Sequence, residues 1–360
     1  MELTPDRAAA EAVVDLDAVA ANARLFRART RAQVMAVVKA DGFGHGAVAV
    51  ARTALDAGAT WLGVTSLTEA LELRDAGLRA PVLSWLNPLG ADFSSAAERD
   101  VDLAVPSLEH LALVAPGTRV HLHLDTGLAR DGAEPEVWPV LCAEARRAER
   151  AGRIRVVGVM GHLACADDPD DPANAAGVRA FDHGVAVARR HGLRPALRHL
   201  AATAATLNDP GTHYDLVRIG AGLVGIDPSR RTPLKTALTL TAPVVAVRRV
   251  AAGTPVGYGH TWRAPVDTHL ALLPLGYGDG VPRGVEAEVQ INGKRCPIVG
   301  RISMDQLVVD VRDEHTRAGD IAVIFGPGEG GEPTVADWAG WAGTIEHEIV
   351  TGLGRRVVRR

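Results

Sequence analysis

Residues 34–46 read VMAVVKADGFGHG, an apolar run of five residues that ends at Lys39 and opens into a loop with three glycines. An alanine-rich stretch of helical period follows over residues 47–57. This order of buried strand, loop and helix is the repeating unit of parallel α/β folds. Lys39 is one of only three lysines in the chain. Lysine can lose its proton and form a Schiff base, which arginine cannot do, although a surface lysine at a strand end is the simpler interpretation.

The same alternation continues through the first two-thirds of the chain and predicts an N-terminal (β/α)8 TIM-type barrel over residues 1–232. A doubly wound open sheet is the alternative. The candidate strands are residues 34–38, 61–64, 81–85, 101–105, 120–124, 154–160, 196–200 and 214–219, and the candidate helices include 47–57, 67–76, 136–151 and 173–191.

A second, smaller all-β domain is predicted over residues 233–360, because the character of the sequence changes near residues 230–236. Glycine-rich turns there separate short β-branched segments, and one helix candidate occurs at residues 335–341. The strand candidates are 237–250, 270–275, 286–291, 296–302, 307–311 and 321–325.

Composition limits the function classes. A formal net charge of −4 over 360 residues gives no general attraction to nucleic acid or to an anionic membrane. Three widely spaced cysteines indicate neither a disulfide framework nor a metal site, and the apolar runs are shorter than a membrane span. We therefore expect a cytoplasmic protein with reduced thiols that binds no nucleic acid, membrane or metal.

Polar residues follow five of the predicted strands, at the barrel face where active sites form. They are Lys39, Arg130, His162, Thr203 and Arg218, the last followed by Gly220. Taken singly, each has a structural interpretation: a surface arginine, a core histidine, a helix cap. A buried arginine at a strand end, however, needs partners.

The ends of the last two barrel strands commonly hold a phosphate group. Thr203, Gly220 and the backbone amides at Ala221 and Gly222 predict such a cradle. An amine at Lys39, a phosphate cradle opposite and cationic groups between them fit a phosphorylated aldehyde. Pyridoxal 5'-phosphate, bound as a Schiff base to Lys39, is the predicted cofactor.

Seven motifs now resemble, in order and over nearly the whole chain, the alanine racemases of the fold-type III pyridoxal-phosphate family. The motifs are residues 37–46 (VVKADGFGHG), 125–130 (DTGLAR), 162–167 (HLACAD), 217–220 (VRIG), 257–259 (GYG), 275–280 (LGYGDG) and 299–306 (VGRISMDQ). The resemblance implies interconversion of L-alanine and D-alanine in a homodimer with shared active sites. It implies two catalytic bases, Lys39 and the partner chain's Tyr258.

The same resemblance implies the remaining roles. Arg218 would donate to the cofactor's pyridine nitrogen and be oriented by His162, and Arg130 would contact the phenolic oxygen and the substrate. Tyr277 and Met304 of the partner would lie beside the amino-acid substrate, with Asp305 supporting them. An arginine at the pyridine nitrogen, in place of a carboxylate, favours reprotonation at Cα over transamination.

Five positions depart from the family pattern. Phe43 and His347 stand where tyrosines usually contact the phosphate, His123 stands where many members have a carbamylated lysine, and Ala202 and Val224 replace an asparagine and a tyrosine. These changes predict weaker cofactor retention or a shifted substrate, such as serine or another small amino acid. A non-catalytic pyridoxal-phosphate-binding protein and a cofactor-free barrel hydrolase are further alternatives.

Overall fold

A computed structural model describes residues 10–312 and 315–360 of the chain. It divides into two compact units, one of them Leu16–Lys235 and the other Thr236–Arg360 together with the segment before Leu16. The short strand β1 (Glu11–Val14) therefore belongs to the second unit, although the sequence interpretation placed all of residues 1–232 in the barrel.

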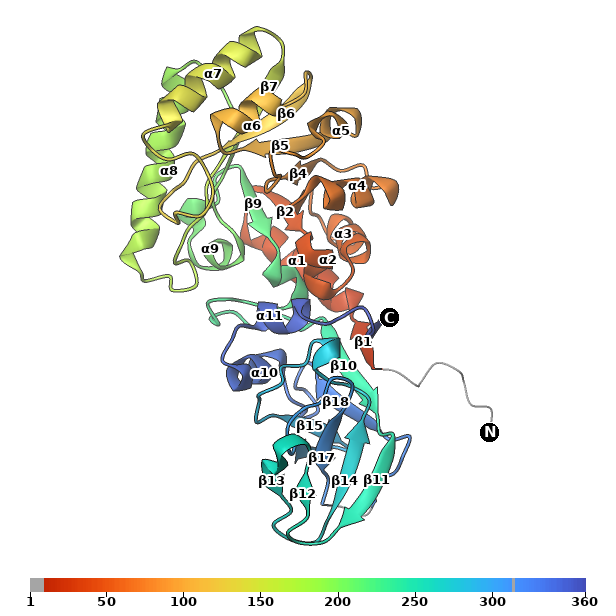
Figure 1. The fold of residues 1–360 in the computed structure, drawn as a ribbon. Coiled ribbons are helices and arrows are strands. Elements are labelled where there is room, and N and C mark those ends of the chain that lie inside the picture. The colour runs from red at the N-terminus through yellow and green to blue at the C-terminus, as the bar shows by residue number, and fades with distance from the viewer. Residues whose placement is uncertain (1–9, 313–314) are drawn as a thin grey trace. The chain divides into compact units, whose positions relative to one another are not determined.

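The first unit is an eight-stranded parallel barrel with helices around it (Figure 1). Its strand order is β8-β7-β6-β5-β4-β3-β2-β9. Backbone hydrogen bonds from Arg218 to Ala201 and from Asp215 to Arg198, both 3.0 Å, link the two end strands. This confirms the predicted (β/α)8 fold over the open sheet. The strands are β2 (Gln33–Val37), β3 (Trp61–Val64), β4 (Val82–Ser84), β5 (Val101–Val105), β6 (Thr118–His123), β7 (Ile154–Met160), β8 (Leu197–His199) and β9 (Leu216–Ile219).

Helices or short helical turns follow the barrel strands, as the alternating pattern predicts. The helical segments after β2 are α2 (Lys39–Gly44), α3 (Ala47–Asp56), α4 (Leu67–Asp75), α5 (Phe93–Glu98), α6 (Leu108–Leu113), α7 (Trp138–Arg150), α8 (Pro172–Arg190), α9 (Thr203–Asn208), η1 (Pro210–Thr212) and η2 (Ala221–Val224).

One further helix, α1 (Leu16–Arg29), precedes the barrel and was absent from the predicted elements. Its Asn22 side chain is buried and donates to the carbonyl oxygens of Leu223 and Lys235, at 3.1 and 2.8 Å. Phe26, on the same helix, packs against Gly222. A Cβ on Gly222 would lie only 2.4 Å from the Phe26 ring, so only glycine fits there. Helix α1 therefore holds the turn that follows β9.

The second unit is built on β-sheets, as predicted, and most of its strands pair antiparallel. Helices α10 (Val335–Ala342) and α11 (Glu346–Thr351) lie late in the chain. Its largest sheet has the order β16-β15-β18-β10-β1-β19, and a three-stranded sheet has the order β11-β14-β17. The strands are β10 (Leu238–Pro243), β11 (Ala246–Val250), β12 (Pro255–Val256), β13 (Trp262–Arg263), β14 (Thr268–Leu273), β15 (Glu288–Ile291), β16 (Lys294–Pro297), β17 (Leu307–Asp310), β18 (Ile321–Phe325) and β19 (Val358–Arg359).

The segment expected as a single strand over residues 237–250 forms two strands, β10 and β11. The chain changes sheets between them. The Val244 amide donates to Asp320 beside the large sheet, while the next amide, Val245, donates to Leu272 in the smaller sheet, both at 2.8 Å. Adjacent residues thus serve different sheets, which a purely local hydrophobic pattern does not reveal.

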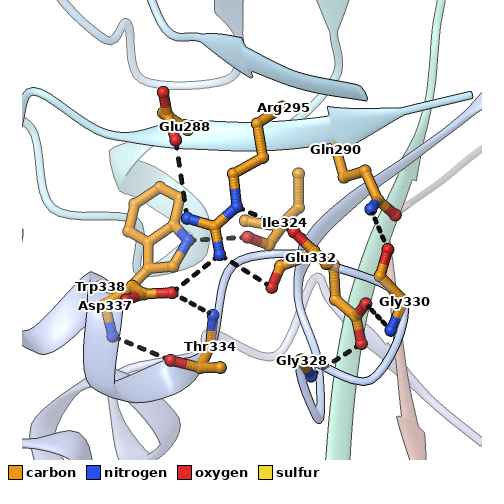
Figure 2. Close-up of polar contacts among 11 residues, drawn as sticks. Glu288, Gln290, Arg295, Ile324, Gly328, Gly330, Glu332, Thr334, Asp337 and Trp338 are labelled. Atoms are coloured by element: carbon orange, nitrogen blue, oxygen red, sulfur yellow. Dashed lines mark hydrogen bonds and ion pairs between the residues drawn. The ribbon is translucent and has the colours of Figure 1, made fainter. Parts of the chain in front are cut away.

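A glycine-rich loop between β18 and α10 is held by charged side chains (Figure 2). Arg295 of β16 donates to the carbonyl oxygens of Gly331 and Glu332, at 2.8 and 3.1 Å. The Glu332 carboxylate in turn accepts from the amides of Gly328 and Gly330, both at 2.8 Å. These side-chain contacts provide hydrogen-bond partners for backbone amides and carbonyls of the loop, which are not paired within a helix or a β-sheet.

None of the helices within residues 10–312 and 315–360 combines the length and apolar character needed to cross a membrane. The same residues contain no cluster of three or more His, Cys, Asp or Glu side chains arranged to hold a metal ion.

Candidate active site

Lys39 lies directly after the first barrel strand, where the chain makes a left-handed helical turn. Residues 40–43 have φ between 50 and 62° and ψ between 39 and 52°. Each non-glycine residue in this conformation costs roughly 1–2 kcal/mol. Three of the four are non-glycine, namely Ala40, Asp41 and Phe43. Strain of this kind, where it persists, commonly marks a functional site.

Specific hydrogen bonds hold the strained turn. The Ala40 amide donates to Glu69 Oε1 at 2.7 Å, and the Ala47 amide donates to Asp41 Oδ1 at 2.9 Å. The other Glu69 oxygen accepts from the amides of Thr65 and Ser66 and from the Thr65 hydroxyl. A single carboxylate therefore ties the Lys39 turn to the start of helix α4.

The charges around Lys39 favour its neutral amine. Burial, followed by the positive charges of Arg130 and Arg218, lowers the pKa of Lys39, while Glu69 opposes this shift. A lysine with a lowered pKa is a better nucleophile at neutral pH. The same surroundings favour an anionic ligand, because three cationic side chains meet there.

Arg218, on β9, is buried and its guanidinium makes five hydrogen bonds. One terminal nitrogen donates to the His199 carbonyl and approaches His199 Nδ1, at 2.9 and 3.2 Å. The other donates to the carbonyls of Gly161 and Leu200 and to His162 Nδ1, the last at 3.1 Å. Among the described residues these contacts occupy both terminal nitrogens, so Nε–H is the donor left for a ligand.

His162 lies at the end of β7 and is fixed by its backbone. The Thr126 hydroxyl donates to the His162 carbonyl at 2.6 Å and accepts from the His162 amide at 3.2 Å. Burial and the charges of Arg218 and Arg130 lower the pKa of His162 to about 3. The imidazole is therefore neutral at physiological pH and accepts a hydrogen bond from Arg218 through Nδ1.

Arg130 is exposed in the loop after β6, next to a contact between the buried His123 and the half-buried Asp131. His123 Nδ1 lies 3.3 Å from Asp131 Oδ2. Burial raises the pKa of Asp131, but its contact with His123 outweighs burial, and the pKa is lowered overall. At the position where the family resemblance implies a modified lysine, this chain places a histidine beside the carboxylate that follows Arg130.

The predicted phosphate cradle lies between α9 and η2. Thr203 is buried, and its hydroxyl accepts from the Gly222 amide at 3.2 Å. Phe43 packs against Gly220, where a Cβ would lie 2.7 Å from the ring. Ala202, at the start of α9, provides no side-chain cap, and Thr203 is the first helical residue instead of the cap. Val224 is buried at the end of η2.

Within the barrel unit, electrostatic interactions link Lys39, Arg130, His162 and Arg218. An aldehyde cofactor with a phosphate group fits these residues on three grounds. Lys39 has a lowered pKa, Arg218 keeps one N–H donor, and the only carboxylate that acts on Lys39 is Glu69. The charges of Arg130 and Arg218 outweigh that of Glu69 and would thus leave a net positive site for an anion.

The remaining predicted residues lie in the second unit. Tyr258 is 68% exposed at the start of η3 (Tyr258–His260), between two glycines with positive φ. Gly257 has a φ of +70° and Gly259 a φ of +73°, so the tyrosine stands on a tight turn. An exposed tyrosine on such a turn has little local packing to explain it.

Tyr277 and Met304 lie together on neighbouring loops. The Tyr277 amide donates to the Ser303 carbonyl at 3.0 Å, and the Gly278 amide donates to the Met304 carbonyl at 2.8 Å. Both side chains are exposed, at 40% and 55%.

Asp305 accepts from Arg356 at 2.6 Å, and the same arginine pairs with Asp279 at 2.9 Å. Arg356 therefore ties the Met304 loop to η4 (Tyr277–Asp279). His347 is partly buried within α11.

The sequence interpretation missed Glu69. Its signal is a capping box: Ser66 accepts from the Glu69 amide while the Glu69 side chain accepts from the Ser66 amide. This motif, a serine followed three residues later by a glutamate at the start of a helix, can be recognised in the sequence. What sequence does not show is that the second oxygen of the same carboxylate reaches the Lys39 turn.

Comparison with known proteins gives two consistent family matches. The model for "Alanine racemase, N-terminal domain" matches residues 14–228, and that for "Alanine racemase, C-terminal domain" matches residues 237–360. The chain is 47% identical over 363 residues to alanine racemase of Thermobifida fusca (strain YX), covering 97% of each chain. It is 46% identical to that of Mycobacterium ulcerans (strain Agy99) over 374 residues, covering 100% of this chain and 96% of the relative.

Solved structures agree. The alanine racemase from D-cycloserine-producing Streptomyces lavendulae superposes with a TM-score of 0.95 at 43% identity, covering 99% of this chain and 97% of that one. The Streptomyces coelicolor A3(2) enzyme also has a TM-score of 0.95 at 43% identity, covering 98% and 97%.

Proposed function

The chain belongs to the alanine racemase family, and from that premise we propose that it interconverts L-alanine and D-alanine with pyridoxal 5'-phosphate. The observation that carries the proposal is the Lys39 site. A lysine of lowered pKa lies on a strained turn near the charges of Arg130 and Arg218, and His162, which these arginines help to keep neutral, is the fourth residue of the group. Serine or another small amino acid is not favoured, because the relatives named above are alanine racemases.

When bound, the cofactor supplies an aldehyde and a conjugated ring that withdraws electrons from the substrate Cα. Lys39 would hold the aldehyde, and Arg218 Nε–H would donate to the pyridine nitrogen. The Thr203, Gly220 and Ala221 region would take the phosphate, next to the Phe43 ring that packs against Gly220. Arg130 would face the phenolic oxygen and the substrate carboxylate.

Racemisation requires a proton to leave one face of Cα and another to arrive at the opposite face. Lys39, whose pKa is lowered by burial and by Arg130, would accept or return the proton on one face. Tyr258 would do so on the other. Its exposed position on the glycine turn supports a role toward a second molecule, not in its own core.

A homodimer with shared active sites completes this proposal. Tyr277 and Met304 would line the substrate site of the partner subunit, and Asp305, paired with Arg356, would hold their loop. Cytoplasmic placement is proposed on the three cysteines, all of them free thiols.

Deuterium exchange at Cα, followed separately from L-alanine and D-alanine, tests the two-base assignment. Lys39→Ala and Tyr258→Phe are expected to impair opposite directions of proton abstraction. Equal impairment of both directions by both variants would exclude the assignment of faces. No racemisation by the wild-type protein supplied with pyridoxal phosphate would exclude the function itself.

A further inference from the structure

A line of buried polar side chains runs through the barrel interior from Asp102, near the start of β5, to Arg218 on β9. Asp102 on β5, His121 on β6 and His199 on β8 are each 0% exposed, and Arg218 is 6% exposed. Asp102 Oδ2 lies 3.3 Å from His121 Nε2, and His121 Nδ1 lies 2.8 Å from His199 Nε2. His199 Nδ1 lies 3.2 Å from the Arg218 guanidinium. The four side chains form one continuous path.

The barrel makes room for this path at a specific glycine. The pairing of β6 with β7 shifts register between Val120 and His121, which places His121 opposite Gly158. A Cβ on Gly158 would lie 2.1 Å from His121 Nδ1. Gly158 has no positive φ, so its lack of a side chain, not its backbone freedom, is what the site requires.

The proton positions along the path follow from its two ends. Arginine only donates, so His199 Nδ1 must accept and its proton must sit on Nε2. That proton makes His121 Nδ1 an acceptor, and the His121 proton then sits on Nε2. A carboxylate only accepts, so Asp102 requires the same arrangement from the opposite end. Every donor therefore points from Arg218 toward Asp102.

The charges at the two ends are opposite, and the path between them is neutral. The partners of Arg218 are carbonyl oxygens and imidazole nitrogens, with no carboxylate among them. Asp102 is held by Arg119 through its other oxygen, Oδ1, at 2.8 Å. Burial and the charges nearby lower the pKa of His199 well below its usual range.

We propose that Asp102, acting through His121 and His199, is a positioning residue for Arg218. This rests on the proposed function, in which Arg218 faces the pyridine nitrogen of the cofactor. By fixing both histidine tautomers, Asp102 keeps the terminal nitrogens of Arg218 engaged and leaves Nε–H aimed at its acceptor. With the tautomers reversed, the Nδ1–H of His199 would face an N–H of Arg218. Two buried donors without an acceptor between them are strongly unfavourable.

Asp102→Asn tests the proposal against a matched control, Asp100→Asn. Asp100 is the other carboxylate that pairs with Arg119, at 2.6 Å, but it lies outside the path. Its φ of +57° suits asparagine as well as aspartate. Asparagine keeps one acceptor oxygen, and Arg119, which only donates, is expected to hold it, so the NH2 group of Asn at position 102 would face His121 Nε2. Both variants therefore remove the negative charge of one Arg119 partner, and only Asp102→Asn replaces the acceptor at the end of the path with a donor.

Two readouts decide the outcome. In protein labelled with ¹⁵N-histidine and kept free of cofactor, NMR is expected to show Nε2–H tautomers for His121 and His199 in the wild type and in Asp100→Asn. Asp102→Asn is expected to show Nδ1–H forms. In the loaded enzyme, kcat for Asp102→Asn is expected to be about tenfold below that of Asp100→Asn, as is typical when an outer partner that orients a ligand is lost. Wild-type tautomers in Asp102→Asn, or a rate equal to that of Asp100→Asn, would overturn the proposal.

If Asp102→Asn does not fold, His121→Leu provides the same test. It breaks the path while leaving Asp102 paired with Arg119, and it replaces a buried imidazole with an apolar side chain. We expect His199 to lose its fixed tautomer and kcat to fall about tenfold. An unchanged His199 signal and rate would refute the proposal. A wild-type protein that does not racemise alanine would refute the proposed function while the tautomers stay measurable.

Discussion

Replacing Glu69 with glutamine tests how the Lys39 turn is held. The Glu69 carboxylate accepts from Ala40 on one oxygen and from three donors of Thr65 and Ser66 on the other. Glutamine has one acceptor oxygen, and the three-donor side is expected to keep it. The amide NH2 would then face the Ala40 N–H, and that hydrogen bond would be lost.

The expected magnitude follows from that single contact. A hydrogen bond to a charged group contributes about 1.5–3 kcal/mol. The left-handed turn it holds contains three non-glycine residues at roughly 1–2 kcal/mol each, so the loss is of the same order as the strain it offsets. We expect Glu69→Gln to lower the free energy of unfolding of the barrel by about 1.5–3 kcal/mol. Removing the carboxylate charge is also expected to lower the pKa of Lys39 further, because Glu69 raises it.

Denaturant unfolding measures the first effect. The second is measured by the pH dependence of Lys39 labelling with an amine-reactive reagent, read by peptide mass spectrometry in cofactor-free protein. Glu72→Gln, an exposed position on the same helix, is the control. Equal stability of the two variants, or a labelling midpoint for Glu69→Gln at or above that of the control, would refute this account of the turn.

Three further outcomes are expected. Gly158→Ala places a Cβ 2.1 Å from His121 Nδ1 and should destabilise the chain by about 1–3 kcal/mol in denaturant unfolding; a stability equal to the wild type would contradict the packing argument. The pKa of His162 is about 3 in the folded chain and about 6.5 when unfolded, so the unfolded chain binds more protons between these values and stability should fall as pH drops through that window. Unfolding measured from pH 7 to pH 4 should have a shallower slope for His162→Gln, and an unchanged slope would refute the shift. Phe43→Tyr restores a hydroxyl next to Gly220 and should tighten binding of pyridoxal phosphate at least about tenfold by equilibrium dialysis, whereas equal affinity would exclude a phosphate contact there.

The barrel strands could be predicted because each is a short apolar run that a helical pattern follows. The ranges 61–64, 101–105 and 154–160 agree with β3, β5 and β7 at both ends. Helix α1 was not predicted because alanine and arginine dominate it, so its apolar face is weak. Strand β1 was missed for a different reason: its partners, β10 and β19, lie far along the chain.

The candidate site divides in the same way. Lys39, Arg130 and His162 follow strands and Arg218 lies near the end of β9, so their shared location at one barrel face was predictable. Asp102, His121 and His199 belong to strands β5, β6 and β8, and the sequence interpretation assigned them no role. Only the structure shows that three different strands bring them into contact, because register between strands is a tertiary property.

Strand β1 has a consequence for how the chain is made. It lies between β10 and β19, pairing antiparallel with the first and parallel with the second. During synthesis β1 emerges before the whole barrel, yet its last neighbour, β19, emerges only with residues 358–359. The barrel can therefore fold on the ribosome while the large sheet of the second unit waits for the final residues of the chain. A fragment starting at residue 236 would lack β1 and leave the edges of β10 and β19 that pair with it unpaired, which favours aggregation.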